Sequence, residues 1–145
     1  LWARLGDAEK SRGFVHRMVT DNCFDNMLSH FRPGPKKLFQ IEANFGLTSG
    51  VVEMLLQSQP ESGEIDAQPV IRLLPALPKE WADGKVTGLL ARGGFEVDIA
   101  WQGGKLVECT IRSLNGNPVK VRYGSETKEL NLKEGKSQQL VASDF

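Results

Sequence analysis

The spacing of apolar residues changes once along this chain of 145 residues, and that change limits the folds that the chain can adopt. Residues 8–19 and 44–57 repeat their apolar positions every three or four residues, which is the period of a helix with one buried face. In the second half, apolar and polar residues alternate, which is the period of a half-buried strand. The change lies near Pro75. We therefore predict an α+β fold, with helices in residues 1–69 and an antiparallel β-domain in residues 70–145.

Local signals indicate where the first helix begins and where a long loop succeeds it. Gly6 is suited to stop a short helical run, and Asp7 is a favoured N-cap for the helix over 8–19. Residues 20–37 have few periodic positions, so we predict a long irregular loop with short helical pieces around 24–30. Loops of this length often carry function.

The second helix has an apolar face and a neighbouring line of glycines. Asn44 is its expected N-cap. The apolar face is formed by Leu47, Val51, Met54 and Leu55. Because glycine is costly inside a helix, we expect a neighbouring helix, loop or ligand to approach Gly46 and Gly50 closely. A leucine at position 50 would then overpack this contact.

The β-domain is predicted to begin with a short strand at 70–74 and to continue as an antiparallel meander. Turns that contain glycine separate the later strands. The inward-facing residues are predicted to be Phe95, Val97, Ile99 and Trp101 in one strand, Val107, Cys109 and Ile111 in the next, and Val119, Val121 and Tyr123 in a third. Strands with one buried face each are typical of a β-sandwich.

Composition excludes several classes of function. The 18 basic and 18 acidic residues balance, so neither nucleic acid nor an anionic membrane is an expected partner. No apolar run approaches the roughly 20 residues that span a bilayer. Cys23 and Cys109 lack the spacing of a zinc site, so we expect two free thiols and no metal. No Gly-rich phosphate loop follows a strand, and we expect no cofactor.

Glu42 is the most prominent candidate for chemistry. It precedes the predicted start of the second helix and is bracketed by Phe39, Ile41 and Phe45, which suggests partial burial. A partly buried carboxylate either finds a partner or shifts its pKa. Two interpretations stay open at this point: a carboxylate that stabilises a helix start, or a catalytic group.

Residues 39–46, Phe-Gln-Ile-Glu-Ala-Asn-Phe-Gly, resemble the Phe-Gln-Ile-Asp-(Gly or Ala)-Asn-Phe-Gly signature of family 95 glycoside hydrolases. That family contains inverting α-L-fucosidases and some α-galactosidases. Further segments resemble the closing part of these enzymes in the same order, and together they cover most of residues 1–115. They are the segments at 2–7, 53–58, 73–78 and 91–97.

The resemblance implies an architecture and an activity. The helices would be the last ones of an (α/α)6 barrel, followed by a C-terminal β-sandwich-like domain. The chain would be a C-terminal fragment of an inverting glycosidase that acts on α-L-fucosides or related α-galactosides, with a glycan or oligosaccharide as substrate. The general acid and the residues that hold the water would lie in the missing N-terminal part, so the isolated chain would be inactive. A periplasmic or secreted location is favoured.

The resemblance also assigns roles to individual residues. Glu42 stands where the family has the aspartate that helps to position the attacking water, so it becomes the catalytic candidate. The extra methylene moves its carboxylate outward by about 1.5 Å, which is large for a preorganised site. His30 is a candidate for substrate binding, because a histidine precedes the signature in the family. The structural part of the motif consists of Gln40, Asn44, Phe45, Gly46 and Gly50.

Two other interpretations remain. The chain could be a non-catalytic β-module with a helical prefix that binds carbohydrate or a protein partner. It could also belong to another (α/α)6 enzyme, such as a family 65 phosphorylase. Trp2, Trp81 and Trp101 could act as sugar platforms, but their strand and corner positions favour core packing.

Overall fold

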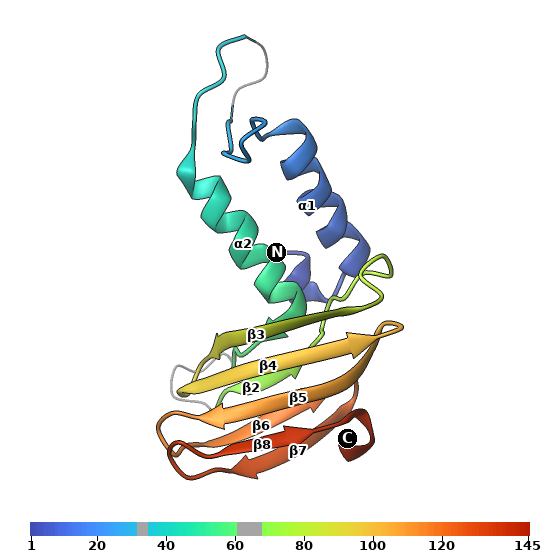
Figure 1. The fold of residues 1–145 in the computed structure, drawn as a ribbon, viewed down its shortest axis with the longest axis vertical. Coiled ribbons are helices and arrows are strands. Elements are labelled where there is room, and N and C mark those ends of the chain that lie inside the picture. Colours follow the sequence, from blue (N-terminus) through green and yellow to red (C-terminus); the bar gives the residue numbers. More distant parts are fainter. Residues whose placement is uncertain (32–34, 61–67) are drawn as a thin grey trace.

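A computed structural model of the chain describes residues 1–31, 35–60 and 68–145. Its helical part consists of a 3-10 helix η1 (Ala3–Leu5) and two α-helices, α1 (Ala8–Asp21) and α2 (Ile41–Leu55). Figure 1 shows α1 and α2 as a hairpin that stands on one end of the β-domain. The separate helical and sheet parts confirm the predicted α+β fold.

The first helix begins as its sequence predicts. Gly6 adopts a left-handed conformation with φ 72° and ends η1, a conformation that costs glycine little. The Asp7 carboxylate then accepts a hydrogen bond from the backbone N–H of Lys10 at 2.9 Å. This bond, supported by the Lys10 side chain, lowers the pKa of Asp7. Asp7 is therefore the N-cap of α1, which runs two residues beyond the predicted end.

The predicted start of α2 at Asn44 is wrong. The helix begins at Ile41 and its N-cap is Gln40, four residues before the predicted cap, and the Gln40 side chain makes no capping hydrogen bond. Asn44 is the fourth residue of α2 instead. Its amide bonds to the preceding loop and not to the N–H groups of its own helix. A tertiary contact has replaced the local cap on which the sequence argument relied.

The loop between α1 and α2 contains none of the predicted helical pieces in its described residues. Between Phe24 and Leu28 the chain makes a tight turn, closed by a hydrogen bond from the Phe24 N–H to the Leu28 carbonyl at 2.8 Å. The Asn26 side chain accepts from the Leu28 N–H, and Met27 has a positive φ of 66°. An asparagine that bonds its own backbone favours a turn over a helix. Residues 32–34 lie outside the described ranges.

The β-domain consists of two four-stranded sheets. One has the order β1-β2-β6-β7 and the other β3-β4-β5-β8. The strands are β1 (Leu56–Gln57), β2 (Val70–Leu73), β3 (Gly84–Ala91), β4 (Phe95–Gln102), β5 (Lys105–Ser113), β6 (Pro118–Tyr123), β7 (Glu126–Asn131) and β8 (Ser137–Leu140), followed by the 3-10 helix η2 (Ala142–Asp144). The β2–β6 pair is parallel and the other pairs are antiparallel. The sheets confirm the predicted sandwich-like domain.

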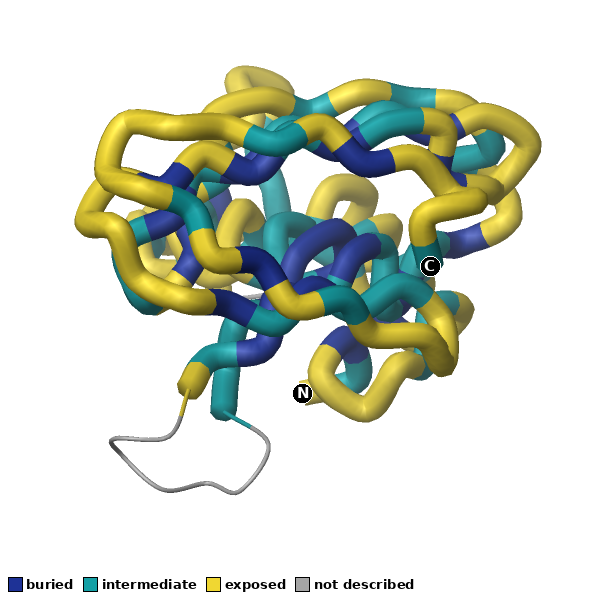
Figure 2. Tube along the Cα trace, turned by 90° about the horizontal axis from the view of Figure 1, so that it is seen from below, coloured by how far each residue is buried: buried dark blue, intermediate teal, exposed yellow. Residues whose placement is uncertain are grey.

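The core of the β-domain lies between these sheets. Phe95, Val97 and Ile99 on β4 are buried, as the alternation predicts, and so is Trp101. Figure 2 shows buried and exposed residues alternating along the strands, with exposed segments at the rim. The Trp101 indole N–H donates to the Trp81 carbonyl at 2.7 Å, and the half-buried Trp81 packs against the same core, so both side chains have structural roles in this arrangement.

Val107 was predicted to face inward on β5, and this prediction is wrong. It is 49% exposed, whereas its neighbour Leu106 is 3% exposed. The pairing register of β4 and β5 shifts between Ala100 and Trp101, so that Leu106 lies opposite Trp101. A shift of one residue moves a side chain to the other face of a sheet. Cys109 and Ile111, beyond the shift, are buried as predicted, and both cysteines are free thiols.

The helical part connects directly to the sheet. The β1 strand continues from the end of α2 and pairs with β2, with Leu56 opposite Leu73. The buried Gln57 amide donates to the carbonyls of Ala3 and Glu53 at 2.7 and 2.9 Å. The predicted domain boundary at 69/70 stays a prediction, since residues 61–67 of the predicted exposed connection lie outside the described ranges. Neither described α-helix is long and apolar enough to cross a membrane.

Candidate active-site segment

The candidate segment, residues 39–46, joins the loop to the first turns of α2. Glu42 lies in the first turn of the helix. Its side chain is exposed, and it makes no hydrogen bond or ion pair with any described residue. The predicted partial burial of Glu42 is therefore wrong for this chain. Phe39 and Phe45, which were expected to cover it, are themselves 52% and 69% exposed.

His30 lies next to the start of this segment. It forms an isolated antiparallel bridge with Phe39, and its backbone N–H donates to the Asn22 carbonyl at 2.8 Å. The imidazole is 3% exposed and packs against the Phe24 ring with a centroid distance of 4.8 Å. Neither ring nitrogen has a hydrogen-bond partner among the described residues. His30 is thus beside the segment, but its ring is enclosed.

Asn44 and Gln40 are each hydrogen-bonded to the loop that precedes the segment. The Asn44 side chain bonds the backbone of Met27 and Ser29, both at 2.9 Å. The Ser29 hydroxyl donates to the Gln40 carbonyl. Ser29 is fully buried and was missed by the sequence analysis, because a serine in an irregular loop carries no periodic signal.

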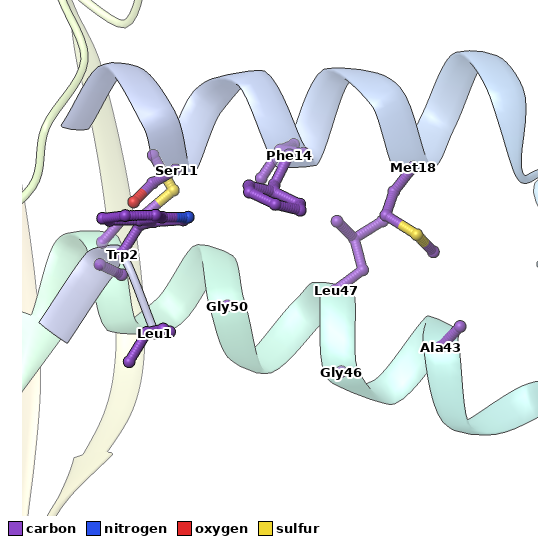
Figure 3. A pocket seen from close by; sticks show the side chains of 12 residues that line it. Leu1, Trp2, Ser11, Phe14, Met18, Ala43, Gly46, Leu47 and Gly50 are labelled. Carbon is purple, nitrogen blue, oxygen red and sulfur yellow. The ribbon is translucent and has the colours of Figure 1, made fainter. Parts of the chain in front are cut away.

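Gly46 and Gly50 line an open groove and are not close to a neighbour. A Cβ placed on either glycine would meet no atom within 4 Å, so the predicted close approach is wrong. The groove lies between α1 and α2 and encloses about 440 Å³. Figure 3 shows Phe14 and Met18 of α1 pointing toward Leu47 of α2 across it.

The lining of this groove limits its chemistry. Most of the residues around it are apolar, and Ser11 supplies the one hydroxyl group. Ala43, on the same helix, lines the groove, whereas the neighbouring Glu42 does not. Successive residues of a helix point about 100° apart. The carboxylate and the groove therefore belong to different faces of α2.

The described residues offer one carboxylate in the segment and no metal centre. No group of three or more His, Cys, Asp or Glu side chains in residues 1–31, 35–60 and 68–145 could hold a metal ion. Glycoside hydrolysis generally uses two carboxyl groups on opposite sides of the bond that is cleaved. The segment can supply one member of such a pair.

Two family models match the chain, and their limits follow its two parts. Residues 1–55 match the glycosyl hydrolase family 95 catalytic domain. Residues 66–144 match the glycoside hydrolase family 95 C-terminal domain. The two parts of the fold are therefore a piece of the catalytic domain of a glycoside hydrolase and the domain that follows it. The chain belongs to glycoside hydrolase family 95. The alternative assignment to a family 65 phosphorylase is therefore wrong.

Curated relatives agree with this assignment. The chain is 38% identical over 112 residues to the probable alpha-fucosidase A of Aspergillus oryzae, covering 74% of the chain and 15% of that protein. It is 35% identical over 152 residues to alpha-L-fucosidase 2 of Arabidopsis thaliana, covering 94% of the chain and 16% of that protein. Probable alpha-fucosidase A of Aspergillus niger is 33% identical over 110 residues, 74% of the chain and 14% of its own length. The chain thus spans about one seventh of these relatives.

Proposed function

We propose that this chain is the closing part of an inverting glycoside hydrolase that acts on α-L-fucosides, and that Glu42 assists the general base of the reaction. One observation carries the proposal. Glu42 presents a carboxylate without a partner among the described residues from the first turn of α2, inside the region that matches the family 95 catalytic domain. The names of the three relatives support a fucoside as substrate.

The position of Glu42 suits the proposed chemistry. In an inverting hydrolase, one carboxylate activates a water on the face of the sugar ring opposite the leaving group, while an acid protonates the leaving oxygen. The N-terminal turn of a helix stabilises a negative charge. Glu42 would help to hold the water, and the general acid would come from a part of the enzyme outside this chain. The active site of the isolated chain would then be incomplete.

Two exposed aromatic side chains beside Glu42 support the proposal that the active site is incomplete in this chain. Phe39 and Phe45 flank Glu42 and are more than half exposed. Large aromatic side chains rarely stay uncovered in a finished site, since their burial is strongly favourable. We expect other parts of the enzyme to cover them and to supply the polar groups that Glu42 lacks here.

His30 is the second residue of the proposal, as a candidate for substrate binding. Its ring nitrogens are buried and unpaired within the described residues, so they can bond a polar group of the substrate only where the rest of the enzyme changes the packing around His30. Buried polar atoms without partners are uncommon and call for an explanation. Packing against Phe24 holds the ring next to the candidate segment.

The experiment measures kcat, KM and melting temperature of the full-length enzyme on an aryl α-L-fucoside. Glu42→Gln keeps the shape and removes the charge, so we expect kcat to fall by about 10² to 10⁴-fold with KM nearly unchanged. Glu42→Asp restores the residue of the family signature that this segment resembles, so it should retain activity or shift the sugar preference and should not abolish turnover. Product analysis by NMR should show the inverted anomer first.

A matched control separates catalysis from helix stability. Glu9 occupies the first turn of α1 as Glu42 occupies that of α2, and Glu9→Gln should leave kcat unchanged. If Glu42→Gln is fully active, the proposal is wrong and Glu42 is a helix-start carboxylate. His30→Phe keeps the ring packing and removes both nitrogens. It should raise KM if His30 binds substrate, and an unchanged KM would remove it from the site.

A further inference from the structure

The side-chain amide of Asn44 joins two segments that are far apart in the sequence. Its Oδ1 accepts a hydrogen bond from the backbone N–H of Ser29, and its Nδ2 donates to the carbonyl of Met27, both at 2.9 Å. One partner is a donor and the other an acceptor, so the orientation of the amide is determined. Asparagine is matched to this pair of partners.

Ser29 completes the connection on the other side of Glu42. The Ser29 hydroxyl donates to the Gln40 carbonyl, and the Gln40 N–H donates to the Ser29 carbonyl at 2.9 Å. The loop at Met27 and Ser29 is therefore bonded both to Gln40 and to Asn44. We call these four residues the Asn44 clamp. Glu42 lies between the two attachment points and makes no bond of its own to the described part of the chain.

The clamp replaces the stabilisation that the start of α2 lacks. The first turn of a helix leaves its N–H groups without partners inside the helix and tends to fray. Gln40 makes no side-chain cap that would prevent this. The clamp instead ties the residues before and after Glu42 to a turn of the loop that is itself closed by hydrogen bonds.

We propose that Asn44 is a positioning residue for the reaction, which sets the location of the Glu42 carboxylate by fixing the first turn of α2. This inference rests on the proposed function of Glu42. A group that holds an attacking water must be placed to within about 0.5 Å, and a misplacement of about 1 Å can cost ~10²-fold in rate. Asn44 acts on the backbone that carries Glu42 and does not touch the substrate.

A double-mutant cycle in the full-length enzyme tests the inference. The variants are Asn44→Ala, Glu42→Gln and the two together, assayed on an aryl α-L-fucoside well below their melting temperatures. We expect Asn44→Ala alone to lower kcat by about 10 to 100-fold with KM nearly unchanged. In the Glu42→Gln background the same change should lower kcat by less than about threefold, because residues that act together are not additive.

Two controls keep the test independent of folding. Thr48→Ala removes a side-chain hydrogen bond to the Asn44 carbonyl within α2 and leaves the clamp intact, so kcat should not change. Ser29→Ala removes only the hydroxyl bond to Gln40, and it should lower kcat by about 3 to 10-fold even if Asn44→Ala fails to fold.

The outcomes distinguish this inference from the proposed function. If Glu42→Gln lowers kcat but neither Asn44→Ala nor Ser29→Ala does, the positioning role is wrong and the role of Glu42 stands. If Asn44→Ala has the same effect in both backgrounds, Asn44 does not act through Glu42 and the inference is wrong. If Glu42→Gln is fully active, both are wrong.

Discussion

The β-domain and the helical hairpin bury their apolar residues to very different extents. In the β-domain, the inward faces of β4, β5 and β6 are almost fully buried, with Phe95, Ile111 and Val121 at 0% exposure. In the hairpin, α1 buries only Ser11. Across the described residues of 1–55, many large hydrophobic side chains remain exposed: Leu1, Leu5, Phe14, Val19, Met27, Leu28, Phe31, Leu38, Phe39, Ile41 and Phe45.

The difference shows which part of the chain is complete in itself. Two sheets that face each other close a core between them. Two helices have more apolar surface than they can bury against each other, and contiguous exposed apolar surface usually has a partner. The hairpin lies in the region that matches the family 95 catalytic domain, and the chain covers 15% of a relative's length, so we expect the rest of that domain to cover the hairpin. Figure 1 shows the hairpin projecting from the β-domain.

The largest expected effect comes from comparing one phenylalanine in each part. Phe95 is completely buried, whereas Phe14 is 55% exposed. In the 145-residue chain, Phe95→Ala should lower the free energy of unfolding by about 3 to 5 kcal/mol, and Phe14→Ala by less than about 1 kcal/mol. Urea denaturation measures both. Equal losses would show that the hairpin is packed as tightly as the β-domain, and the comparison would fail.

A second test uses the thiol in the β-domain core. Burial raises the pKa of Cys109 to about 12 from 9.0, and the carboxylates of Asp144 and Glu108 add to the shift. Well below pH 9 both the folded and unfolded thiols are protonated, so the shift has no effect on stability. Between pH 9 and about 12 the unfolded thiol loses its proton first, and stability falls as pH rises.

Cys109→Ala should remove this contribution. The stability difference between the parent and the variant should shrink by on the order of 1 to 2 kcal/mol between about pH 8 and about pH 10.5. Ile111→Val, on the same face of β5, is the control, because it has no ionisable group and should cost the same at each pH. A parent-to-Cys109→Ala difference that does not depend on pH would mean that the thiol is open to water.

The smallest expected effect is in the hairpin. A Cβ on Gly50 would meet no atom within 4 Å, so Gly50→Ala should stabilise the chain by about 0.5 to 1 kcal/mol through helix propensity alone. Gly13, in α1, has equally open surroundings and should respond in the same way. A lower melting temperature for Gly50→Ala would contradict the open surroundings of Gly50 and would support the close approach that the sequence pattern first indicated.

The candidate site could be predicted only in part. The resemblance of residues 39–46 to a family signature and their place near the start of a helix could be read from the sequence, although the helix begins earlier than predicted. The surroundings of Glu42 did not, because apolar neighbours in the sequence do not cover a side chain unless another element packs on them. The role of Asn44 also differed from the predicted N-cap, because its side-chain amide bonds the backbone of Met27 and Ser29 and not the N–H groups of its own helix.

The sequence by itself determined the two periods of apolar residues, and with them the order of helices and strands, the Asp7 cap and most of the core of the β-domain. These depend on contacts between near neighbours or on one face of one element. Only the tertiary structure decided the parallel pairing of β2 with β6, the exposure of Val107 and the Asn44 clamp. Each depends on which distant segment of the chain pairs or bonds with the residue, and the local spacing of apolar residues does not specify that segment.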